Sequence, residues 1–242
     1  MRFAAILLTA IWLNSCSDGG SVSETSARVP LELCARTESV AATRSTTPLT
    51  AGRLGIFRLG QAGSMPQAYL YTASAGVWES ETPLMLDSGD ATVCAWYPFD
   101  YFTVTAPEDP KSVPLQARKY DAAHDLTYMA SVTNLNARNH RLQVRLSHAC
   151  SILEFRLTRD SYTGTGAIGT ITLSAPGLLA SATLDITSGT YSNGTAADVS
   201  FNADITVTGA NPVTAAVLLP PATLTGPLSV TVTVDGKERT VV

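Results

Sequence analysis

The 242-residue chain has little charge and hardly any Lys. Charged residues make up 15% of it, three of them are Lys, and the formal net charge is -4. A weakly acidic chain of this kind offers no basic patch for nucleic acid or for anionic lipid. We therefore expect no nucleic-acid partner, and any attachment to a membrane has to be covalent.

The chain also lacks the motifs on which cofactor, metal and catalytic sites depend. It has no P-loop, no dinucleotide-binding glycine pattern, no calcium loop and no paired His on a helix. The adjacent His124 and Asp125 have no Ser nucleophile or oxyanion loop with them, and His148 is better explained as a hydrogen-bonded structural residue. Asp87 and Asp90 are typical of a solvated turn. A hydrolase would need a carboxylate pair in a cleft, and the sequence singles out none. We expect no catalytic residue, no metal and no cofactor, so the protein is not predicted to be an enzyme.

No apolar run is long enough to cross a bilayer as a helix. The longest, Phe3–Leu13, has eleven residues and follows Met1-Arg2, as in the apolar region of a signal peptide. The next residues, Leu13-Asn14-Ser15-Cys16, resemble a bacterial lipobox, which implies cleavage before Cys16 and a lipid anchor through that residue. Residues 1–15 are then a lipoprotein signal peptide and residues 16–28 a tether. The alternative is an ordinary secretory signal with an incidental Cys.

The cysteines are too few for a disulfide framework. Once Cys16 is lipidated, Cys34, Cys94 and Cys150 remain, and an odd number cannot pair completely. Each lies in an apolar stretch, so we expect three core thiols. A single Cys94–Cys150 bridge is the alternative.

The chain is rich in Thr, with 31 residues. Most of them alternate with apolar residues, as in β-strands. The pattern predicts strands over residues 29–34, 53–59, 68–72, 77–86, 91–99, 112–117, 168–173, 182–186, 199–207, 214–219, 228–234 and 238–242. Within 141–157 the apolar residues change from even to odd positions, which predicts a bulge or a strand that passes from one sheet to another. Asp235-Gly236 predicts a type I′ hairpin turn.

These signals predict an all-β protein of two sandwich domains. Residues 133–139 have the composition of a connector. We place the N-terminal β-sandwich at 29–135 and the C-terminal one at 136–242.

One aromatic cluster, Trp96 to Phe102, has two interpretations. Aromatic residues that alternate at the end of a strand are typical of a core and a proline-terminated edge. The same residues could form a stacking platform for sugar rings. We favour the structural interpretation.

Several segments, in order along the chain, resemble the fimbrillin family, the lipoprotein-derived pilus subunits of Bacteroidales. They are the leader with Cys16, Val29-Pro30-Leu31-Glu32-Leu33, Thr43-Arg44-Ser45-Thr46, Gly52 to Phe57, Val77-Trp78, Ala95-Trp96-Tyr97-Pro98, Leu146 to Phe155, and Leu218 to Pro221 followed by Leu228 to Gly236. The resemblance implies two transthyretin-like Greek-key β-sandwiches in tandem and an outer membrane lipoprotein precursor at the cell surface or in a fimbrium. It implies as partners other fimbrial subunits, of the same or an accessory kind, a maturation protease, and a ligand on a host or bacterial surface.

The resemblance also implies a maturation step. An Arg-specific protease cuts after the first strand, the strand carrying Val29, Leu31 and Leu33 is displaced, and a strand from a neighbouring subunit fills the groove. Arg44 is the first candidate for the cut, since residues 41–47 are small and polar. Arg36, closer to the strand, is the second. The alternative is that neither is cut and the strand stays in place.

The family continues beyond the hairpin at Asp235-Gly236 with further strands, whereas this chain stops at Val242. The resemblance therefore implies that the second sandwich is incomplete at its C-terminus, or that the chain is a variant that donates no C-terminal strand. A second hypothesis is a surface glycan-binding β-sandwich lipoprotein with Trp78, Trp96 or Tyr101 as stacking residues.

Overall fold

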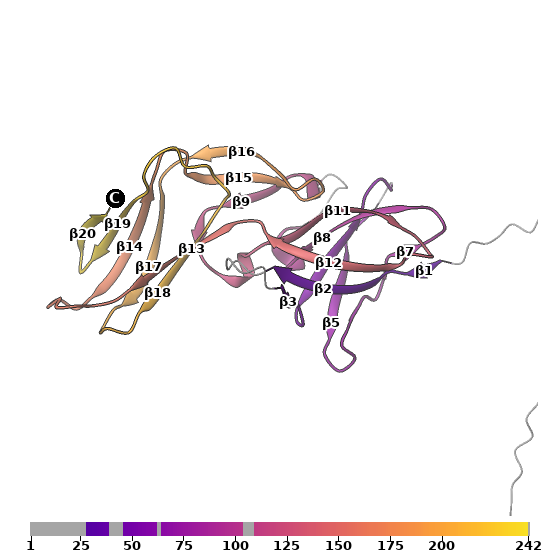
Figure 1. Cartoon of the computed structure of the whole chain (residues 1–242), viewed down its shortest axis with the longest axis horizontal. Helices are drawn as coiled ribbons and strands as arrows, with labels where there is room; N and C mark the ends of the chain where they lie inside the picture. Colours follow the sequence, from indigo (N-terminus) through magenta and orange to yellow (C-terminus); the bar gives the residue numbers. More distant parts are fainter. Residues whose placement is uncertain (1–27, 39–45, 62–63, 104–108, 242) are drawn as a thin grey trace, which may run out of the picture.

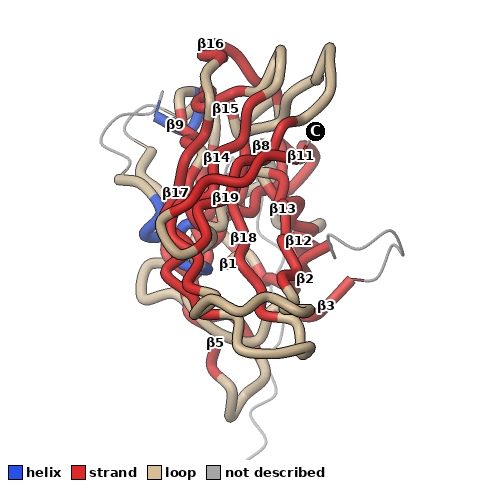
Figure 2. Tube along the Cα trace, turned by 90° about the vertical axis from the view of Figure 1, so that its left-hand side faces the viewer, coloured by secondary structure: helices blue, strands red, loops and turns tan. Residues whose placement is uncertain are grey.

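The computed structural model describes residues 28–38, 46–61, 64–103 and 109–241 (Figure 1). The regular elements of the described residues are strands and three short 3₁₀ helices, so the all-β prediction is confirmed (Figure 2). The strands are β1 (Val29–Pro30), β2 (Glu32–Glu38), β3 (Thr46–Pro48), β4 (Arg53–Arg58), β5 (Gln67–Thr72), β6 (Val77–Glu79), β7 (Met85–Leu86), β8 (Ala91–Tyr97), β9 (Val113–Gln116), β10 (Arg118–Lys119), β11 (Thr127–Leu135), β12 (Arg141–His148), β13 (Ser151–Leu157), β14 (Ala167–Ser174), β15 (Leu179–Asp185), β16 (Thr190–Ala196), β17 (Val199–Thr206), β18 (Val213–Leu219), β19 (Ser229–Val234) and β20 (Lys237–Val241). The helices are η1 (Phe99–Tyr101), η2 (Asp109–Lys111) and η3 (Ala122–His124). Among the described residues, no helix is long and apolar enough to cross a membrane.

The N-terminal part is built on an eight-stranded sheet in the order β3-β2-β12-β11-β8-β4-β5-β6. The sheet is curled, so that β6 at one end comes close to β2 near the other. Apolar side chains that alternate along the strands point into the curl and are fully buried there, among them Leu54, Ile56, Val93 and Val144. A strand at the end of this sheet therefore closes the same core as the strands at its centre.

Residues 141–157, in which the apolar positions change phase, pass from one sheet to another. Of the two predicted alternatives, a bulge or a change of sheet, the second is confirmed. β12 belongs to the eight-stranded sheet, whereas β13 pairs with β18 in a separate sheet. Ala149 and Cys150 separate the two strands, and both are buried. The change from even to odd apolar positions therefore marks the point at which the chain passes from one sheet to the other.

The C-terminal part is a sandwich of two sheets, β17-β14-β19-β20 and β10-β18-β13. Buried residues of β14, β17 and β18 fill the space between them, including Ile171, Phe201 and Val217. The predicted hairpin joins β19 to β20. Asp235 has a φ of 46° and Gly236 a φ of 76°, the positive values that a type I′ turn requires, so this prediction is confirmed.

A third core lies between these two parts, under the sheet β16-β15-β9 (Figure 1). It brings Phe57 and Trp96 from the first half of the chain together with Leu184 and Leu218 from the second. The strand pairing does not follow the predicted division at 135/136. β9 and β10 pair with β15 and β18, and β12 pairs with β2 and β11.

Several strand boundaries differ from the prediction. The expected strand over 77–86 is two strands, β6 and β7, interrupted by residues 80–84, which include Pro83. The expected connector over 133–139 begins inside β11 and ends in a tight turn to β12, bridged by Asn136 and Asn139. The alternation does not predict β11 or β16.

Candidate strand-exchange site

The first described strands belong to two sheets: β1 to a two-stranded sheet with β7, and β2 to the eight-stranded sheet. β1 pairs antiparallel with β7, with Val29 opposite Leu86. β2 pairs parallel with β12 along six residue pairs, from Glu32 opposite Arg141 to Thr37 opposite Leu146. On its other side β2 has only the three-residue strand β3. β2 is therefore one strand from the edge, and a long row of its hydrogen bonds goes to β12.

The side chains of this segment alternate between the core and the solvent, as predicted. Leu31 and Ala35 are 3% and 4% exposed, and Leu33 is half-buried against the same core. Leu33 lies beside Leu142 of β12 and Ala35 beside Val144. Both of these β12 residues are buried. The structure thus places Leu31 and Leu33 in the core, whereas Val29 is half-buried in β1. Removal of β1 and β2 would uncover the apolar row of β12.

The solvent side of β2 carries polar contacts. Glu32 Oε2 accepts a hydrogen bond from Arg141 Nε at 2.8 Å, and its other oxygen lies 3.5 Å from His140 Nε2. These charged groups are exposed or half-buried, so they contribute little to stability compared with the apolar contacts.

The cysteines correct one prediction. Cys34 lies on the solvent side of β2 and is exposed, because the alternation that buries Leu33 and Ala35 turns Cys34 outward. Cys94 and Cys150 are buried core thiols, as expected, and burial raises the pKa of each to about 12. All three are free, so the alternative Cys94–Cys150 bridge is not formed.

The two candidate cleavage residues differ in position. Arg36 lies inside β2, opposite Arg145 of β12 and Pro48 of β3. Arg44 lies outside the described residues, in the link between β2 and β3, and Cys16 is outside them as well.

A groove of about 1030 Å³ runs between the β1–β2 segment and the β5–β6 hairpin. Leu31 and Leu33 form part of one wall, and Tyr69 and Trp78 belong to the other. Two of the residues predicted to leave with the first strand, Leu31 and Leu33, therefore border an open, partly apolar space.

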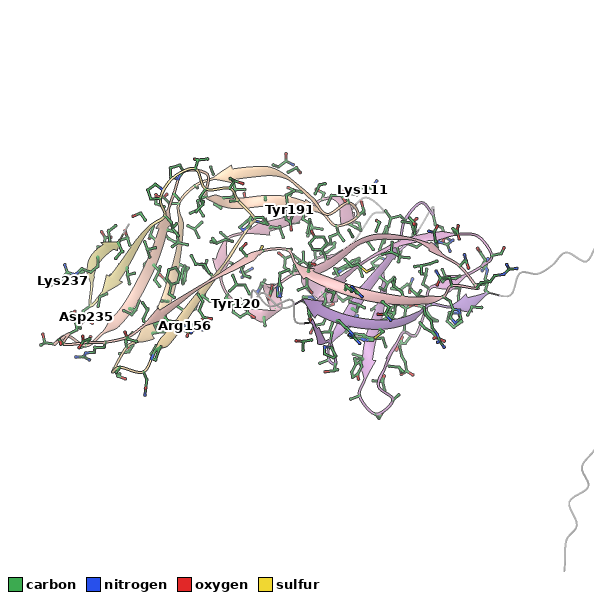
Figure 3. The ribbon with its side chains drawn as sticks, viewed as in Figure 1. Lys111, Tyr120, Arg156, Tyr191, Asp235 and Lys237 are labelled. Atoms are coloured by element: carbon green, nitrogen blue, oxygen red, sulfur yellow. The ribbon has the colours of Figure 1, made fainter. Side chains whose placement is uncertain are left out.

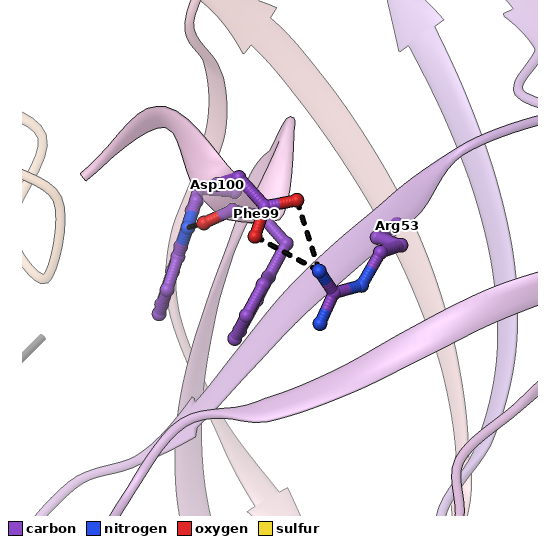
Figure 4. Close-up of polar contacts among 4 residues, drawn as sticks. Arg53, Phe99 and Asp100 are labelled. Carbon is purple, nitrogen blue, oxygen red and sulfur yellow. Dashed lines mark hydrogen bonds and ion pairs between the residues drawn. The ribbon is translucent and has the colours of Figure 1, made fainter. Parts of the chain in front are cut away.

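The aromatic cluster is structural. Trp96 is fully buried, donates its Nε1 hydrogen to the Phe99 carbonyl at 3.1 Å and stacks on the Phe99 ring. Arg53 covers Phe99 from outside, 4.7 Å from the ring centroid, and contacts both oxygens of Asp100 (Figure 4). Trp96 is buried and cannot stack on a sugar, and Trp78 is only 7% exposed. The prediction that these two residues stack on a glycan is therefore wrong. Tyr101 remains half-buried against the central core.

The histidines are paired with carboxylates. His124 Nδ1 lies 2.9 Å from Asp121, while Asp125 lies 2.8 Å from His148 Nδ1. His148 is thus the hydrogen-bonded structural residue that the sequence predicts. Within the described ranges, no three His, Cys, Asp or Glu side chains come together as metal ligands.

The fold is similar to that of solved structures of proteins from Bacteroides. A proposed cell adhesion protein from Bacteroides uniformis superposes with a TM-score of 0.64 at 18% identity, over 88% of this chain and 84% of the other. A proposed cell adhesion protein from Bacteroides ovatus gives 0.58 at 16% identity, over 89% and 86%. At these identities the similarity defines the class of fold.

The sequence itself gives the family. Residues 42–241 match the profile described as Fimbrillin-like, so the chain belongs to the fimbrillin-like family, as its resemblance implies. Among curated proteins, none matches this chain. Family membership gives the protein a fimbrial role at the cell surface, in a family of structural proteins.

Proposed function

We propose that the protein is a fimbrial subunit that is exported as a lipid-anchored precursor and assembles by strand exchange after proteolysis. Cys16 carries the anchor, a protease cuts after Arg44, and the segment with Val29, Leu31 and Leu33 leaves the sheet. A strand from a neighbouring subunit then pairs with β12. Its main-chain groups replace the lost hydrogen bonds, and its alternate side chains refill the core.

One observation carries the proposal: β2 is a long strand of the sheet whose loss opens a continuous slot. Six residue pairs join β2 to β12. Among them, Leu33 lies beside the buried Leu142 and Ala35 beside the buried Val144. An uncovered apolar row beside a free strand edge strongly favours recruitment of another strand. β3 is too short to fill the slot.

The strand pairing supports Arg44 as the cleavage residue over Arg36. A protease binds its substrate as an extended segment free of other pairing, and Arg36 is engaged with a strand on each side. A cut after Arg44 would also leave all of β1 and β2 on the released piece.

The test is limited trypsin digestion of the full chain with Cys16→Ser, so that no acyl chain adds to association. We expect a cut after Arg44, loss of the preceding segment and a shift from monomer to oligomer, read by intact mass and light scattering. Arg44→Gln should stop the shift, whereas Arg138→Gln, in the exposed turn before β12, should leave it unchanged.

Two outcomes would reject parts of the proposal. If the cut occurs and the segment leaves but the protein stays monomeric, strand exchange is wrong. Resistance at both Arg44 and Arg36 would remove the processing step. The anchor is tested separately, by incorporation of a labelled fatty acid that Cys16→Ser abolishes.

A further inference from the structure

The curled N-terminal sheet comes close to closing on itself. β6, the last strand of this sheet, approaches β2, but in the described part of the chain no strand pairing joins the two. The groove of about 1030 Å³ follows this gap, and side chains from both faces of β6 line it. A groove of this size holds a small ligand or a short segment of a larger one.

Exposed apolar side chains gather on the hairpin that borders the groove. Leu70 of β5 is 54% exposed and Val77 of β6 is 42% exposed, and both line the groove. Leu70 lies opposite Glu79 and Val77 opposite Thr72, so the two apolar side chains share one face of the hairpin. Apolar residues that are exposed together favour a surface that contacts a ligand.

The lining of the groove is acidic. Three carboxylates belong to it, those of Glu32, Glu79 and Glu81. Among the described lining residues the one cation is Arg53, and both oxygens of Asp100 hold it. A cleft lined by one sign of charge attracts a ligand of the opposite sign.

Two of these carboxylates have no cation beside them. Glu32 is ion-paired with Arg141, whereas Glu79 only accepts a hydrogen bond from the Thr72 hydroxyl at 2.7 Å. Within the described ranges neither Glu79 nor Glu81 forms an ion pair, and both are exposed. The two residues are therefore free to pair with cations of a ligand.

A buried donor that lines the groove has no acceptor. Trp78 is 7% exposed, and its Nε1 hydrogen makes no hydrogen bond to the residues that the structure describes. In that part of the chain, the side-chain N and O atoms that are both buried and unpartnered are Ser131 Oγ and His140 Nδ1. Trp78 Nε1 therefore reaches solvent, in the groove that this residue lines. An indole placed in this way can donate to an oxygen of a ligand.

We propose that the groove binds a short basic peptide segment of a partner protein. Two Arg or Lys side chains of the peptide pair with Glu79 and Glu81, and its apolar side chains cover Leu70 and Val77. A backbone carbonyl of the peptide accepts the Nε1 hydrogen of Trp78. A basic peptide supplies all three features, whereas a polyamine has no acceptor and a neutral sugar has no cation.

The site goes beyond the proposed function and does not depend on it. Recognition uses side chains and one carbonyl, and no strand enters or leaves a sheet. Leu31 and Leu33 form part of one wall, so the groove is complete while β2 is in place. The site is therefore tested on the uncleaved chain, and failure of the trypsin experiment leaves its readings unchanged.

The experiment uses the full chain with Cys16→Ser and Arg44→Gln, and a short fluorescent peptide with two Arg among four Leu. In a second peptide citrulline, which is neutral and of nearly the same shape, replaces both Arg. We expect the Arg peptide to bind at least about tenfold more tightly by fluorescence anisotropy. High salt should reduce this difference, because the carboxylates are exposed and their charges are screened.

Removal of the two free charges supplies the matched variants. Glu79→Gln with Glu81→Gln should weaken binding of the Arg peptide at least about fivefold and leave the citrulline peptide unchanged. Glu238→Gln on β20 is the control and should change neither affinity by more than about twofold. Figure 3 shows the neighbouring Lys237 at the opposite end of the molecule from the N-terminal sheet. All three glutamates are exposed, so folding is not at risk.

The Trp78 contact has two readings. Trp78→Phe keeps a ring in the core and removes the donor, so it should weaken both peptides about threefold. Because this residue is buried, the Tm of the variant is measured alongside. The second reading needs no variant at this position: the Nε1–H resonance of Trp78 should shift as the Arg peptide is added. That of Trp96, which donates to the Phe99 carbonyl, should not.

Three results would overturn the proposal: equal binding of the two peptides, no binding of either, or binding that survives Glu79→Gln with Glu81→Gln. Binding that leaves the Trp78 resonance in place would overturn it as well. Sedimentation of the uncleaved chain is measured first. A dimer that excludes the peptide would place a second copy in the groove, and displacement of the peptide by a neutral oligosaccharide would make the groove a sugar site. Either outcome would also overturn the proposal.

Discussion

At the scale of single residues, Asp235 fixes the end of the C-terminal sandwich. Its carboxylate accepts hydrogen bonds from the Thr165 and Tyr162 hydroxyls and from the backbone amides of Gly166 and Ala167. These donors, the Thr165 hydroxyl above all, hold the pKa of Asp235 well below its ordinary value. The turn of the β19–β20 hairpin is thereby tied to the loop before β14.

A lowered carboxyl pKa makes this tie sensitive to acid. Asp235 is ionised in the folded chain at a pH where it would already be protonated in the unfolded chain, so its contribution is complete above the unfolded pKa of about 4 and is lost as the pH falls below it. We expect Asp235→Asn to lower the Tm at pH 7. The difference in Tm between this variant and the original chain should become smaller as the pH approaches 3. Scanning calorimetry from pH 7 to 3 measures both. A deficit independent of pH would contradict the ionic contribution; Asn tolerates the positive φ, so the turn itself is preserved.

The cysteines differ in exposure, which makes a second prediction at this scale. Cys34 is exposed on β2, whereas burial raises the pKa of Cys94 and Cys150 to about 12. Since the thiolate is the reactive form, we expect a short pulse of N-ethylmaleimide at pH 7.5 to label Cys34 and to spare the two buried thiols. The chain carries Cys16→Ser, peptide mapping by mass spectrometry reads the sites, and a denatured sample should be labelled at all three remaining cysteines. Labelling of Cys94 in the folded chain would contradict the structure.

At the scale of strands, the Trp96 ring of β8 packs against β4 at Gly55, which has no side chain. A Cβ added to Gly55 would lie 2.5 Å from the Trp96 ring, which is itself fully buried. We expect Gly55→Ala to cost about 1–3 kcal/mol by forcing the ring or the strand to move. For a chain of this size that lowers the Tm by roughly 2–4 °C per kcal/mol. Gly209→Ala is the control, since an added Cβ there meets nothing within 4 Å; an equal loss in both variants would contradict the argument.

The local alternation of apolar and polar residues predicts some of the strands but not others. The Asp235-Gly236 turn and the phase change within 141–157 follow from rules that operate over a few residues, and both are confirmed. β16 shows no alternation because every one of its residues is exposed, and its hydrogen bonds to β15 hold it in place. Nothing in its own sequence carries that information.

The candidate site shows the same limit. The alternation of Leu31 and Leu33 predicts which face of the first strand is buried. It does not predict that this strand pairs in parallel with β12, with Glu32 opposite Arg141. Which strands pair, when they are so far apart in the sequence, depends on how the whole sheet closes. For the same reason the sequence does not predict the groove that Trp78 lines.

At the scale of the whole molecule, the two halves of the chain share structure across the predicted boundary. β9 and β10 come before residue 136 but complete the sheets of β15 and β18. The central core joins Trp96 to Leu184 and Leu218. A division at 135/136 would separate strands that hydrogen-bond to one another and would open this core to water.

We therefore expect the fragment 136–242 to fail to fold by itself. It loses the strands that cover Ala182 and Leu184 on β15 and it keeps β12 without β2 or β11. A fragment 109–242 restores β9 and β10, and we expect it to recover strand content and cooperative melting, measured by far-ultraviolet circular dichroism. The full chain should melt in one transition, because the central core transmits the loss of either half to the other. A stably folded 136–242 fragment, or two separate transitions in the full chain, would show instead that the sandwiches are independent and that the central core contributes little to holding them together.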